Sequence, residues 1–464
     1  MARQQYITRL WRDTAIRHGF EEINGPTFEM LDLYTRKSGE GIVSELFRFR
    51  REGGEDNYAM RPEFTPTLAR MYAARAASLP SPTKWFSIGP YFRAEKPQRG
   101  RLREFLQWNV DVLGGEPQTD EFWANDAETI SVMTMCLGHM GLRSPVLDVH
   151  VSHRYALEQS LRMSGVSSEA MNVAIQLVDS LPKLSVEAAD AMAGAIGLDL
   201  SRLEWILGQL GEHADSSQRQ DLELLDKVYE AGDAGHIAVD VMEFCERLND
   251  RGSVIRHYTD MSIARGLAYY TGTVFEVIAE GERAIAGGGR YDNLIELFGG
   301  PPTPAVGFGM GDVVLGLLLD DKGLMPGGAE LLDALSRPGA SLRPEAFVVA
   351  GSEDEDALVE PLLANLRRGV EREGFEGKPW AADRYAARPM HARRTYKTTR
   401  NLKKLLTDAE KQHARFAVVL HGADKVQVKD LDKREELVHD RGDFSVDPAS
   451  NAYVGTAIAS RLGF

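Results

Sequence analysis

The stretch that decides the fold is GPYFRAEKPQRGRLREFLQWNVDVLGG, residues 89–115. Two strand-like runs flank a polar, glycine-containing loop, and this pattern predicts an antiparallel hairpin. We place Arg93 and Glu95 on the first strand, and along the return strand every second residue belongs to the set Arg101, Arg103, Phe105, Gln107, Asn109 and Asp111. Side chains alternate between the faces of a strand, so one face of this hairpin is almost wholly polar. An inward polar face predicts a ligand site, and the alternative is a solvated outer face of a sheet.

Length and composition limit the class of protein. A chain of 464 residues predicts two or three domains. Cys136 and Cys245 are far apart and form no C-x-x-C pair, which favours a reduced compartment without disulfides or zinc. His150 and His153 point to opposite faces of an expected strand, so we expect no protein-bound metal. No run approaches about 20 apolar residues, so we expect a cytoplasmic protein with no membrane contact.

The alternation of patterns predicts an α+β fold in two domains. Strand-like runs at 85–92, 106–114, 146–151 and 272–279 belong to a core over residues 1–325. A helical insertion is expected at about 160–250, where Ser201-x-x-Glu204 has the form of a capping box. Gly and Pro are frequent around 326–344, which we interpret as a linker.

Beyond the linker, residues 345–464 are expected to form a small α/β domain with a partly parallel sheet. Strands are predicted at 346–351 and 415–422 and helices at 357–374 and 398–412, the last capped by Thr398 or Thr399.

A basic stretch stands out against the net charge of -15. Residues 384–404 contain no acid and are interleaved with Tyr385 and Tyr396. Cations neutralise phosphates and aromatic rings stack on bases, so this stretch predicts a single-stranded RNA surface; the alternative is a solvated helix face and loop. The candidate RNA-binding residues are Arg384, Arg388, Arg393, Arg394, Lys397 and Arg400.

Two further stretches bring chemistry together. In MRPEFTPTLARMYA, residues 60–73, an extended conformation would turn Arg61, Glu63 and Thr65 to one face. In ARGLAYYTGTVFEV, residues 264–277, Arg265 precedes the phenols of Tyr269 and Tyr270 at the mouth of a strand. The glycines of AGGGRYD, residues 286–292, are compatible with a turn, and those of GFGMG, residues 307–311, indicate tight backbone packing.

These motifs resemble a known family. The pattern R-x-E, loop, R-x-x-x-F, formed by Arg93, Glu95, Arg101 and Phe105, resembles motif 2 of class II aminoacyl-tRNA synthetases. RGLAYYTGTVFEV resembles the histidine-specific signature of the histidyl-tRNA synthetases, and AGGGRYDNLIELFGG with PAVGFGMG resembles their approach to motif 3. The resemblance covers nearly the whole chain.

The resemblance implies a fold and an activity. The fold would be a class II antiparallel sheet flanked by helices, with a helical insertion and a C-terminal α/β anticodon-binding domain. The protein would be a homodimer through its motif 1 region, HGFEEINGPTFEM at residues 18–30. In protein biosynthesis it would be a ligase that activates histidine with ATP, accompanied by Mg²⁺, and transfers it to tRNA(His).

The resemblance also assigns residues to the phosphoryl chemistry. Arg93 would contact the α-phosphate of ATP and the substrate carboxylate, and Arg265 would be the second cation there. Glu95 would read the adenine amino group and Phe105 would stack on the ring. Preorganised cations of this kind stabilise the charge of the transition state.

A second set of residues would bind histidine. Asp111 and Tyr270 would bond the two imidazole nitrogens, with Tyr269 nearby. A site that bonds both nitrogens rejects amino acids without them by roughly 10⁴ to 10⁵-fold. The remaining substrate-binding candidates are Glu63, Phe64, Thr65 and Gln107, of which Glu63, Thr65 and Gln107 would hold the ammonium group.

The sequence departs from the family pattern at three places. Asp111 takes the place of a glutamate that many bacterial members carry, and Val314 takes the place of the motif 3 arginine that would bind the γ-phosphate. Arg290 is our candidate for the replacing cation and an ATP-binding residue. The family's short N-terminal strand is absent, which raises the expectation of a start upstream of Met1.

Two silent relatives are the alternatives to an enzyme. One is the histidine-sensing regulatory subunit of ATP phosphoribosyltransferase, and the other is a tRNA-binding regulatory module without catalysis. The basic C-terminal region argues against the sensor, and the presence of Arg93 and Arg265 argues against both.

Overall fold

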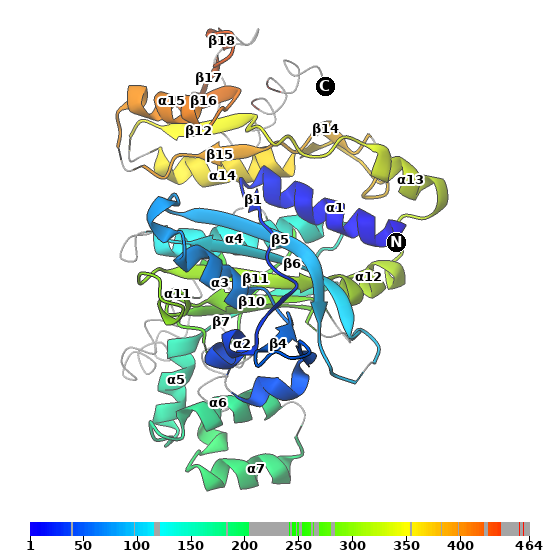
Figure 1. Cartoon of the computed structure of the whole chain (residues 1–464). Coiled ribbons are helices and arrows are strands. Elements are labelled where there is room, and N and C mark those ends of the chain that lie inside the picture. The colour runs from blue at the N-terminus through cyan, green and yellow to red at the C-terminus, as the bar shows by residue number, and fades with distance from the viewer. Residues whose placement is uncertain are drawn as a thin grey trace.

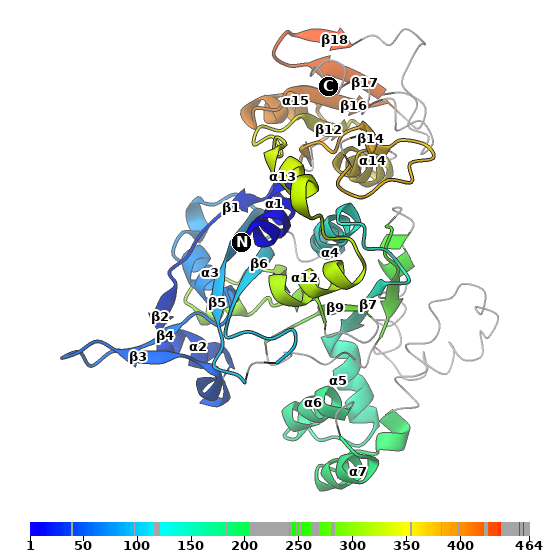
Figure 2. The ribbon, with the colours of Figure 1, turned by 90° about the vertical axis from the view of Figure 1, so that its right-hand side faces the viewer.

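The computed structural model describes residues 1–38, 40–96, 98–115, 121–181, 184–203, 241, 244–246, 248–249, 253–260, 263, 269–279, 284–352, 355–381, 383–397, 399–421, 426–437, 454 and 458. Within these residues the chain forms an α+β core, a helical insertion and a smaller C-terminal α/β domain (Figure 1). The expected fold class is therefore confirmed. Figure 2 shows the C-terminal domain and the insertion at opposite ends of the core.

An eight-stranded sheet forms the centre of the core, in the order β1-β5-β6-β11-β10-β9-β7-β8. Its outermost pairs, β1 with β5 and β7 with β8, are parallel, and its other neighbours are antiparallel. The four predicted core strands are all present, as β5, β6, β7 and β9. The strand bounds are β1 Glu21–Glu22, β5 Thr83–Phe92, β6 Glu104–Leu113, β7 Leu147–His153, β8 His257–Thr259, β9 Thr273–Ala279, β10 Ala286–Arg290 and β11 Ala305–Gly311.

The β5–β6 hairpin is shorter than the sequence predicts. Arg93, Glu95, Arg101 and Arg103 lie in its connecting loop, so their placement on strands was wrong. After Arg93 the backbone leaves the ladder, because the next amide, that of Ala94, donates to the carbonyl of Glu45, 2.8 Å away. The candidate arginines are therefore positioned by a loop at the open end of the hairpin.

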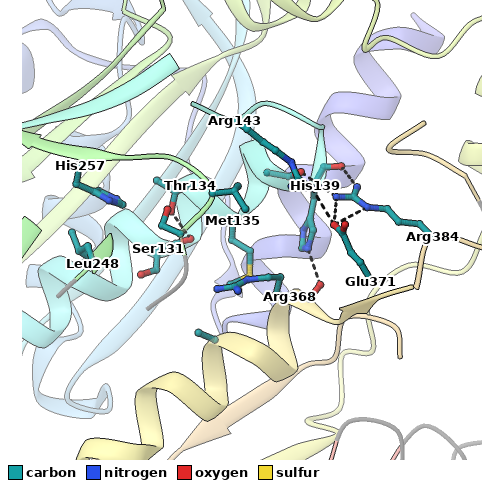
Figure 3. Close-up of a pocket in the computed structure, with 14 residues that line it drawn as sticks. Ser131, Thr134, Met135, His139, Arg143, Leu248, His257, Arg368, Glu371 and Arg384 are labelled. Carbon is teal, nitrogen blue, oxygen red and sulfur yellow. Dashed lines mark hydrogen bonds and ion pairs between the residues drawn. The ribbon is translucent and has the colours of Figure 1, made fainter. Parts of the chain in front are cut away.

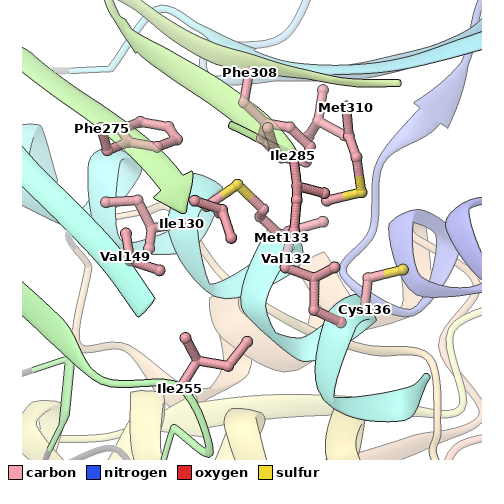
Figure 4. Packing of buried hydrophobic residues seen from close by; sticks show 14 of the residues in the cluster. Ile130, Val132, Met133, Cys136, Val149, Ile255, Phe275, Ile285, Phe308 and Met310 are labelled. Atoms are coloured by element: carbon pink, nitrogen blue, oxygen red, sulfur yellow. The ribbon is translucent and has the colours of Figure 1, made fainter. Parts of the chain in front are cut away.

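One face of the sheet is covered by the helices α1 (Ala2–Arg17), α4 (Glu121–His139) and α12 (Asp312–Asp321). The N-terminal helix α1 is amphipathic, and Trp11 on its buried side stacks on Trp108 of β6 with ring centroids 6.0 Å apart. Figure 4 shows the core beneath α4, where Ile130 and Met133 lie among side chains of the sheet that include Phe275 and Phe308. This apolar layer fixes the sheet, so the opposite face is left to carry polar groups.

The opposite face carries a second, three-stranded sheet in the order β2-β4-β3 and several short helices. Thr65 is the first residue of a helix whose first turn contains Pro66, a residue favoured there, so the extended conformation expected for residues 61–65 was wrong. The bounds are β2 Phe28–Met30, β3 Arg48–Arg50, β4 Asn57–Met60, α2 Leu31–Ser38, α3 Thr65–Ala73, α11 Leu294–Leu297, and the 3₁₀ helices η1 Glu40–Glu45 and η2 Ala76–Ser78.

The helical insertion is present where the structure describes it, as α5 (Arg154–Met163), α6 (Met171–Ser180) and α7 (Val186–Ala195). The predicted cap of the next helix was wrong in position. Asp199 accepts a hydrogen bond from the amide of Arg202 at 3.0 Å, and Ser201 is already helical. Glu204 lies outside the described residues.

The C-terminal domain contains a five-stranded sheet in the order β15-β12-β16-β17-β18, parallel over its first three strands and antiparallel over the rest. The partly parallel sheet was predicted. Asn401, which accepts from the amide of Lys404, caps α15 in place of the expected threonines, and the linker contains a helix, α13. The bounds are α13 Gly328–Ser336, β12 Ala346–Ala350, α14 Asp356–Arg368, β13 Val370–Glu371, β14 Tyr385–Ala387, β15 Ala392–Arg394, α15 Leu402–Lys411, β16 Phe416–Leu420, β17 Val426–Asp430 and β18 Glu435–Leu437.

Cys136 and Cys245 are buried free thiols. In the described part of the chain, no helix combines the length and apolarity needed to cross a bilayer.

Candidate functional site

The polar face predicted from the hairpin exists and is buried. Gln107, Asn109 and Asp111 of β6 are 9%, 4% and 3% exposed, while the alternating residues between them face the helical layer. Gln107 donates to Asn109 at 2.7 Å, and Asn109 donates to the hydroxyl of Tyr91 at 3.2 Å. Because the face is buried and its groups are bonded to each other, it is a built polar site and not a solvated surface.

Glycines of the neighbouring strands make room for this face. A Cβ atom at Gly307 would overlap the carboxylate of Asp111, and one at Gly309 would lie 2.6 Å from Nε2 of Gln107. The expectation of tight packing at GFGMG is therefore confirmed. The AGGG segment is strand β10 and not a turn, and a Cβ at Gly289 would lie 3.0 Å from the ring of Tyr270.

Three phenols form a cluster that reaches Asp111 through Tyr291. The hydroxyl of Tyr291 donates to Oδ1 of Asp111, and the ring centroids of Tyr269 and Tyr270 are 4.4 Å apart. Burial raises the pKa of all three tyrosines. The negative charge of Glu63 raises the pKa of Tyr269 and Tyr270 further, and that of Asp111 does so for Tyr291. The hydroxyls therefore stay protonated at neutral pH and can donate hydrogen bonds.

Tyr291 was missed by sequence reasoning although a signal was present. It follows β10, where Arg290 faces the helical layer and the next side chain must face the site. The alternation of the strand was sufficient to separate these two neighbours.

A cavity of about 500 Å³ adjoins the polar face and reaches the hairpin loop. Glu276, 8% exposed, is an acid in strand β9, whose other residues are apolar apart from Thr273, and sequence reasoning missed it despite that contrast. The lining includes Arg93, Glu95, Arg101, Phe105, Gln107, Glu276, Gly287, Gly309 and Val314. Cations, carboxylates and an aromatic ring in one cavity suit a nucleotide.

The candidate ATP-binding residues at the open end of the hairpin have partners within the hairpin. The guanidinium carbon of Arg93 lies 5.3 Å from the ring centroid of Phe105, and its Nε donates to the carbonyl of Pro62 at 3.3 Å. Glu95 forms a 2.8 Å ion pair with Arg101. The structure thus brings Arg93, Glu95 and Phe105 to one cavity, together with Val314.

The candidates from the segment around α3 have different surroundings. Glu63 is half-buried and close enough to influence the pKa of Tyr269 and Tyr270. Thr65 begins α3 and is half-buried. The ring of Phe64 is fully buried in an apolar cluster with Leu68, so it supports the site from below.

Two arginines complete the predicted site residues. Arg265 lies outside the described residues. Arg290 is 1% exposed, and its Nη2 lies 3.0 Å from Asp126 of α4, with Nη1 3.2 Å from Asp292. Its side chain forms a buried ion pair on the helical side of the sheet and does not line the cavity that Val314 lines.

The basic stretch is less exposed than the sequence suggests. Arg384 is 3% exposed and bonds Glu371 at 2.6 Å and the carbonyl of His139 at 3.1 Å, an interface drawn in Figure 3. Arg384 therefore lies in a contact between the domains and not on an exposed surface. Three more pairs are Arg394 with Glu360, Lys397 with Asp408 and Arg400 with Asp356, and Arg388 bonds Glu345. Arg393 donates to His391 at 2.9 Å.

Comparison with known proteins agrees with this geometry. The family model described as histidyl-tRNA synthetase matches residues 1–311. A histidine–tRNA ligase from Opitutus terrae is 40% identical over 351 residues, covering 75% of this chain and 78% of that protein. One from Halobacterium salinarum is 39% identical over 322 residues, covering 68% of this chain and 70% of that protein.

A solved structure extends the likeness in fold. The crystal structure of histidyl-tRNA synthetase from a Nostoc species has a TM-score of 0.56 and 21% identity, and covers 93% of this chain and 92% of that one. The polar face, the phenol cluster and the matched family model lead to one conclusion: the chain belongs to the histidyl-tRNA synthetase family.

Proposed function

We propose that this chain is a histidine–tRNA ligase. A carboxylate oxygen of histidine attacks the α-phosphorus of ATP, the bond to the β-phosphate bridging oxygen breaks, and pyrophosphate leaves. A ribose hydroxyl of tRNA(His) then attacks the carbonyl of the adenylate and releases AMP. The observation that carries the proposal is the buried pair of Asp111 and Tyr291 with Tyr269 and Tyr270 beside it, adjacent to a nucleotide-sized cavity.

The site supports a division of roles. Asp111 and Tyr270 bind the imidazole, because a buried acceptor and a protonated phenol complement its two nitrogens. Glu63, Thr65 and Gln107 hold the ammonium group, and Phe64 supports them.

Other residues act on ATP. Arg93 neutralises the α-phosphate, and Phe105 beside it presents an aromatic face to adenine. Glu95 accepts a hydrogen bond from the adenine amino group. Arg265 remains the proposed second cation. Mg²⁺ arrives with ATP, and the carboxylate of Glu276 in the cavity is the oxygen donor type that this ion prefers.

We propose that the reaction takes place in the cytoplasm and that the protein is a homodimer. Phe28, Met30 and Phe49 are 51%, 41% and 42% exposed on the small sheet, and Phe28 lies 5.3 Å from Phe49 and 5.7 Å from Tyr58 between ring centroids. An exposed aromatic cluster of this kind is typical of an interaction surface, and it begins in the motif 1 region. Phe28→Ser with Phe49→Ser should convert the dimer to monomer in sedimentation velocity.

Residues 345–464 are proposed to bind the anticodon region, with Arg388, Arg393, Arg394, Lys397 and Arg400 as the basic candidates that remain.

The deciding experiment is histidine-dependent exchange of pyrophosphate into ATP. We expect exchange with histidine and with no other standard amino acid. Histidine binding without exchange would support the silent histidine sensor instead, and tRNA binding without either would support a regulatory module.

A further inference from the structure

A second large cavity lies where the core meets the C-terminal domain. Its volume is about 680 Å³. The core contributes the C-terminal end of α1, Gly19, β1 and Lys84, and the C-terminal domain contributes Arg367 of α14 and the residues of β15. Figure 1 shows the end of α1 and β1 beside α14 and β15. We call this cavity the interdomain pocket; it shares no lining residue with the cavity at the hairpin loop.

Two cations of the interdomain pocket share one carboxylate. Lys84 Nζ lies 2.8 Å from Glu128, and Arg367 Nη1 lies 3.0 Å from the same carboxylate. The side chains of Lys84 and Arg367 are 8% and 4% exposed. The two buried cations therefore carry one more positive charge than this carboxylate neutralises.

The histidines there carry no charge at neutral pH. Burial and the neighbouring cation Arg367 lower the pKa of His18 to about 4, and burial and Arg393 lower the pKa of His391 to about 3. They contribute neither to the excess of positive charge nor to its compensation.

Arg393 adds a second charge and is held in place. It donates Nε to His391 at 2.9 Å and Nη1 to Gln412 at 3.4 Å, both neutral groups. Its side chain lies against Gly19, whose φ is 79°, and a Cβ there would be 2.9 Å from Nε of Arg393. Among the residues that the structure describes, no carboxylate lies within ion-pair distance of this guanidinium.

The remaining charged groups of the lining do not remove the excess. Three ion pairs balance themselves: Arg394 with Glu360, Lys397 with Asp408 and Arg12 with Glu22. Glu21 is exposed at the rim, and its negative charge raises the pKa of Arg393, which burial lowers. Among the described residues, the positive charges of Lys84, Arg367 and Arg393 are therefore met by the negative charges of Glu128 and Glu21.

We propose that the interdomain pocket binds a phosphate group. A buried cation without its own counterion is costly, and an anion removes that penalty. The planar guanidinium of Arg393 suits two phosphate oxygens. The source is an RNA backbone phosphate, which rests on the proposed function, or a free phosphate or pyrophosphate, which does not.

The test compares two arginines of the same basic stretch in the full-length protein. Arg393→Gln removes the unpaired cation, while Arg400→Gln removes an exposed arginine paired with Asp356 outside the pocket. Thermal unfolding is followed with inorganic phosphate or pyrophosphate against chloride at equal ionic strength. Affinity for tRNA is measured against salt concentration for the same proteins, with Arg393→Lys as the conservative variant.

Two results support the proposal. If phosphate stabilises the wild type and Arg400→Gln, and Arg393→Gln needs about tenfold more for the same shift, the pocket binds the free anion. If phosphate has no effect but Arg393→Gln lowers the salt slope of tRNA binding by about one, with Arg393→Lys retaining it, the source is RNA.

Other results overturn it. Equal phosphate and tRNA responses in Arg393→Gln and wild type would mean that the pocket holds no phosphate, whatever the exchange activity is. If the wild type shows no histidine-dependent exchange, the proposed function is contradicted. The binding of free phosphate to the pocket is then still decided by the thermal unfolding measurements. If Arg393→Gln does not fold, Arg393→Met, which also removes the charge, is measured in its place, and an unchanged response of that variant to both ligands overturns the proposal.

Discussion

The hydroxyl of Tyr291 donates a hydrogen bond to the carboxylate of Asp111 across the antiparallel strands of the core. Both side chains are almost fully buried, at 2% and 3% exposure. The bond holds the carboxylate where a neighbouring phenol, Tyr270, can complete a site for a ligand with two nitrogens.

Replacing Asp111 by Asn should damage histidine use more than ATP use. Removing a charged acceptor from a buried hydrogen bond corresponds to about 1.5 to 3 kcal/mol, or roughly 10 to 150-fold in kcat/KM for histidine. Pyrophosphate exchange at varied histidine and at varied ATP separates the two. Tyr291→Phe is the milder variant, with an expected loss of about tenfold. A normal KM for histidine in Asp111→Asn would argue against its role.

Replacing Arg290 by Ala should unfold the protein more readily and leave ATP use unchanged in the folded fraction. The change leaves the buried carboxylate of Asp126 without this cation. Burial raises the pKa of Asp126 to about 6 although the charge of Arg290 lowers it. Breaking a buried ion pair in this way costs about 3 to 5 kcal/mol. Urea unfolding measures the loss, and the double variant Arg290→Met with Asp126→Leu should recover part of it. A stable Arg290→Ala with a raised KM for ATP would restore the γ-phosphate role.

These cases show what the sequence could predict. The period of two along β6 identifies Gln107, Asn109 and Asp111 as one face, because alternation is a local property of a strand. The same rule, applied to β10, would have separated Arg290 from Tyr291.

The burial of Arg384 could not be predicted in this way. Its partners, Glu371 and the carbonyl of His139, come from other elements, one of them 245 residues away in sequence. Composition alone presents every arginine of the stretch as equally exposed. The prediction of the helix cap at Ser201 was wrong for a related reason. Asp199 and Ser201 are both favourable capping residues, and only the three-dimensional course of the backbone determines which of them begins the helix.

Arg384→Met should lower stability without changing how tRNA binding depends on salt. The side chain bonds Glu371 and a buried carbonyl, and loss of such bonds costs about 1 to 3 kcal/mol. Arg394→Gln is the matched comparison, because Arg394 is half-buried beside Tyr396, with its guanidinium 4.9 Å from the ring centroid. It should reduce the slope of log affinity against log salt by about one. The opposite pattern would return Arg384 to the RNA surface.

Lowering the pH from 7 to 5 should destabilise the junction between the domains. His18 and His391 have pKa values of about 4 and 3 in the folded protein, so they stay neutral there while the unfolded chain takes up protons below about 6.5. The stability that this contributes is fully present above the unfolded pKa and is lost as the pH falls toward the folded value, about 2 kcal/mol for each imidazole at pH 5.

The groups that face these imidazoles fix the sign of the effect. His18 lies beside Arg367, Lys84 and Glu128, and His391 beside Arg393, so cations outnumber the single carboxylate and oppose protonation. Urea midpoints of His391→Gln at pH 7 and 5 should differ less than those of the wild type. The exposed His421→Gln serves as the control and should behave as the wild type. An equal loss of stability in His391→Gln and wild type would show that protonation of this imidazole is not what weakens the junction.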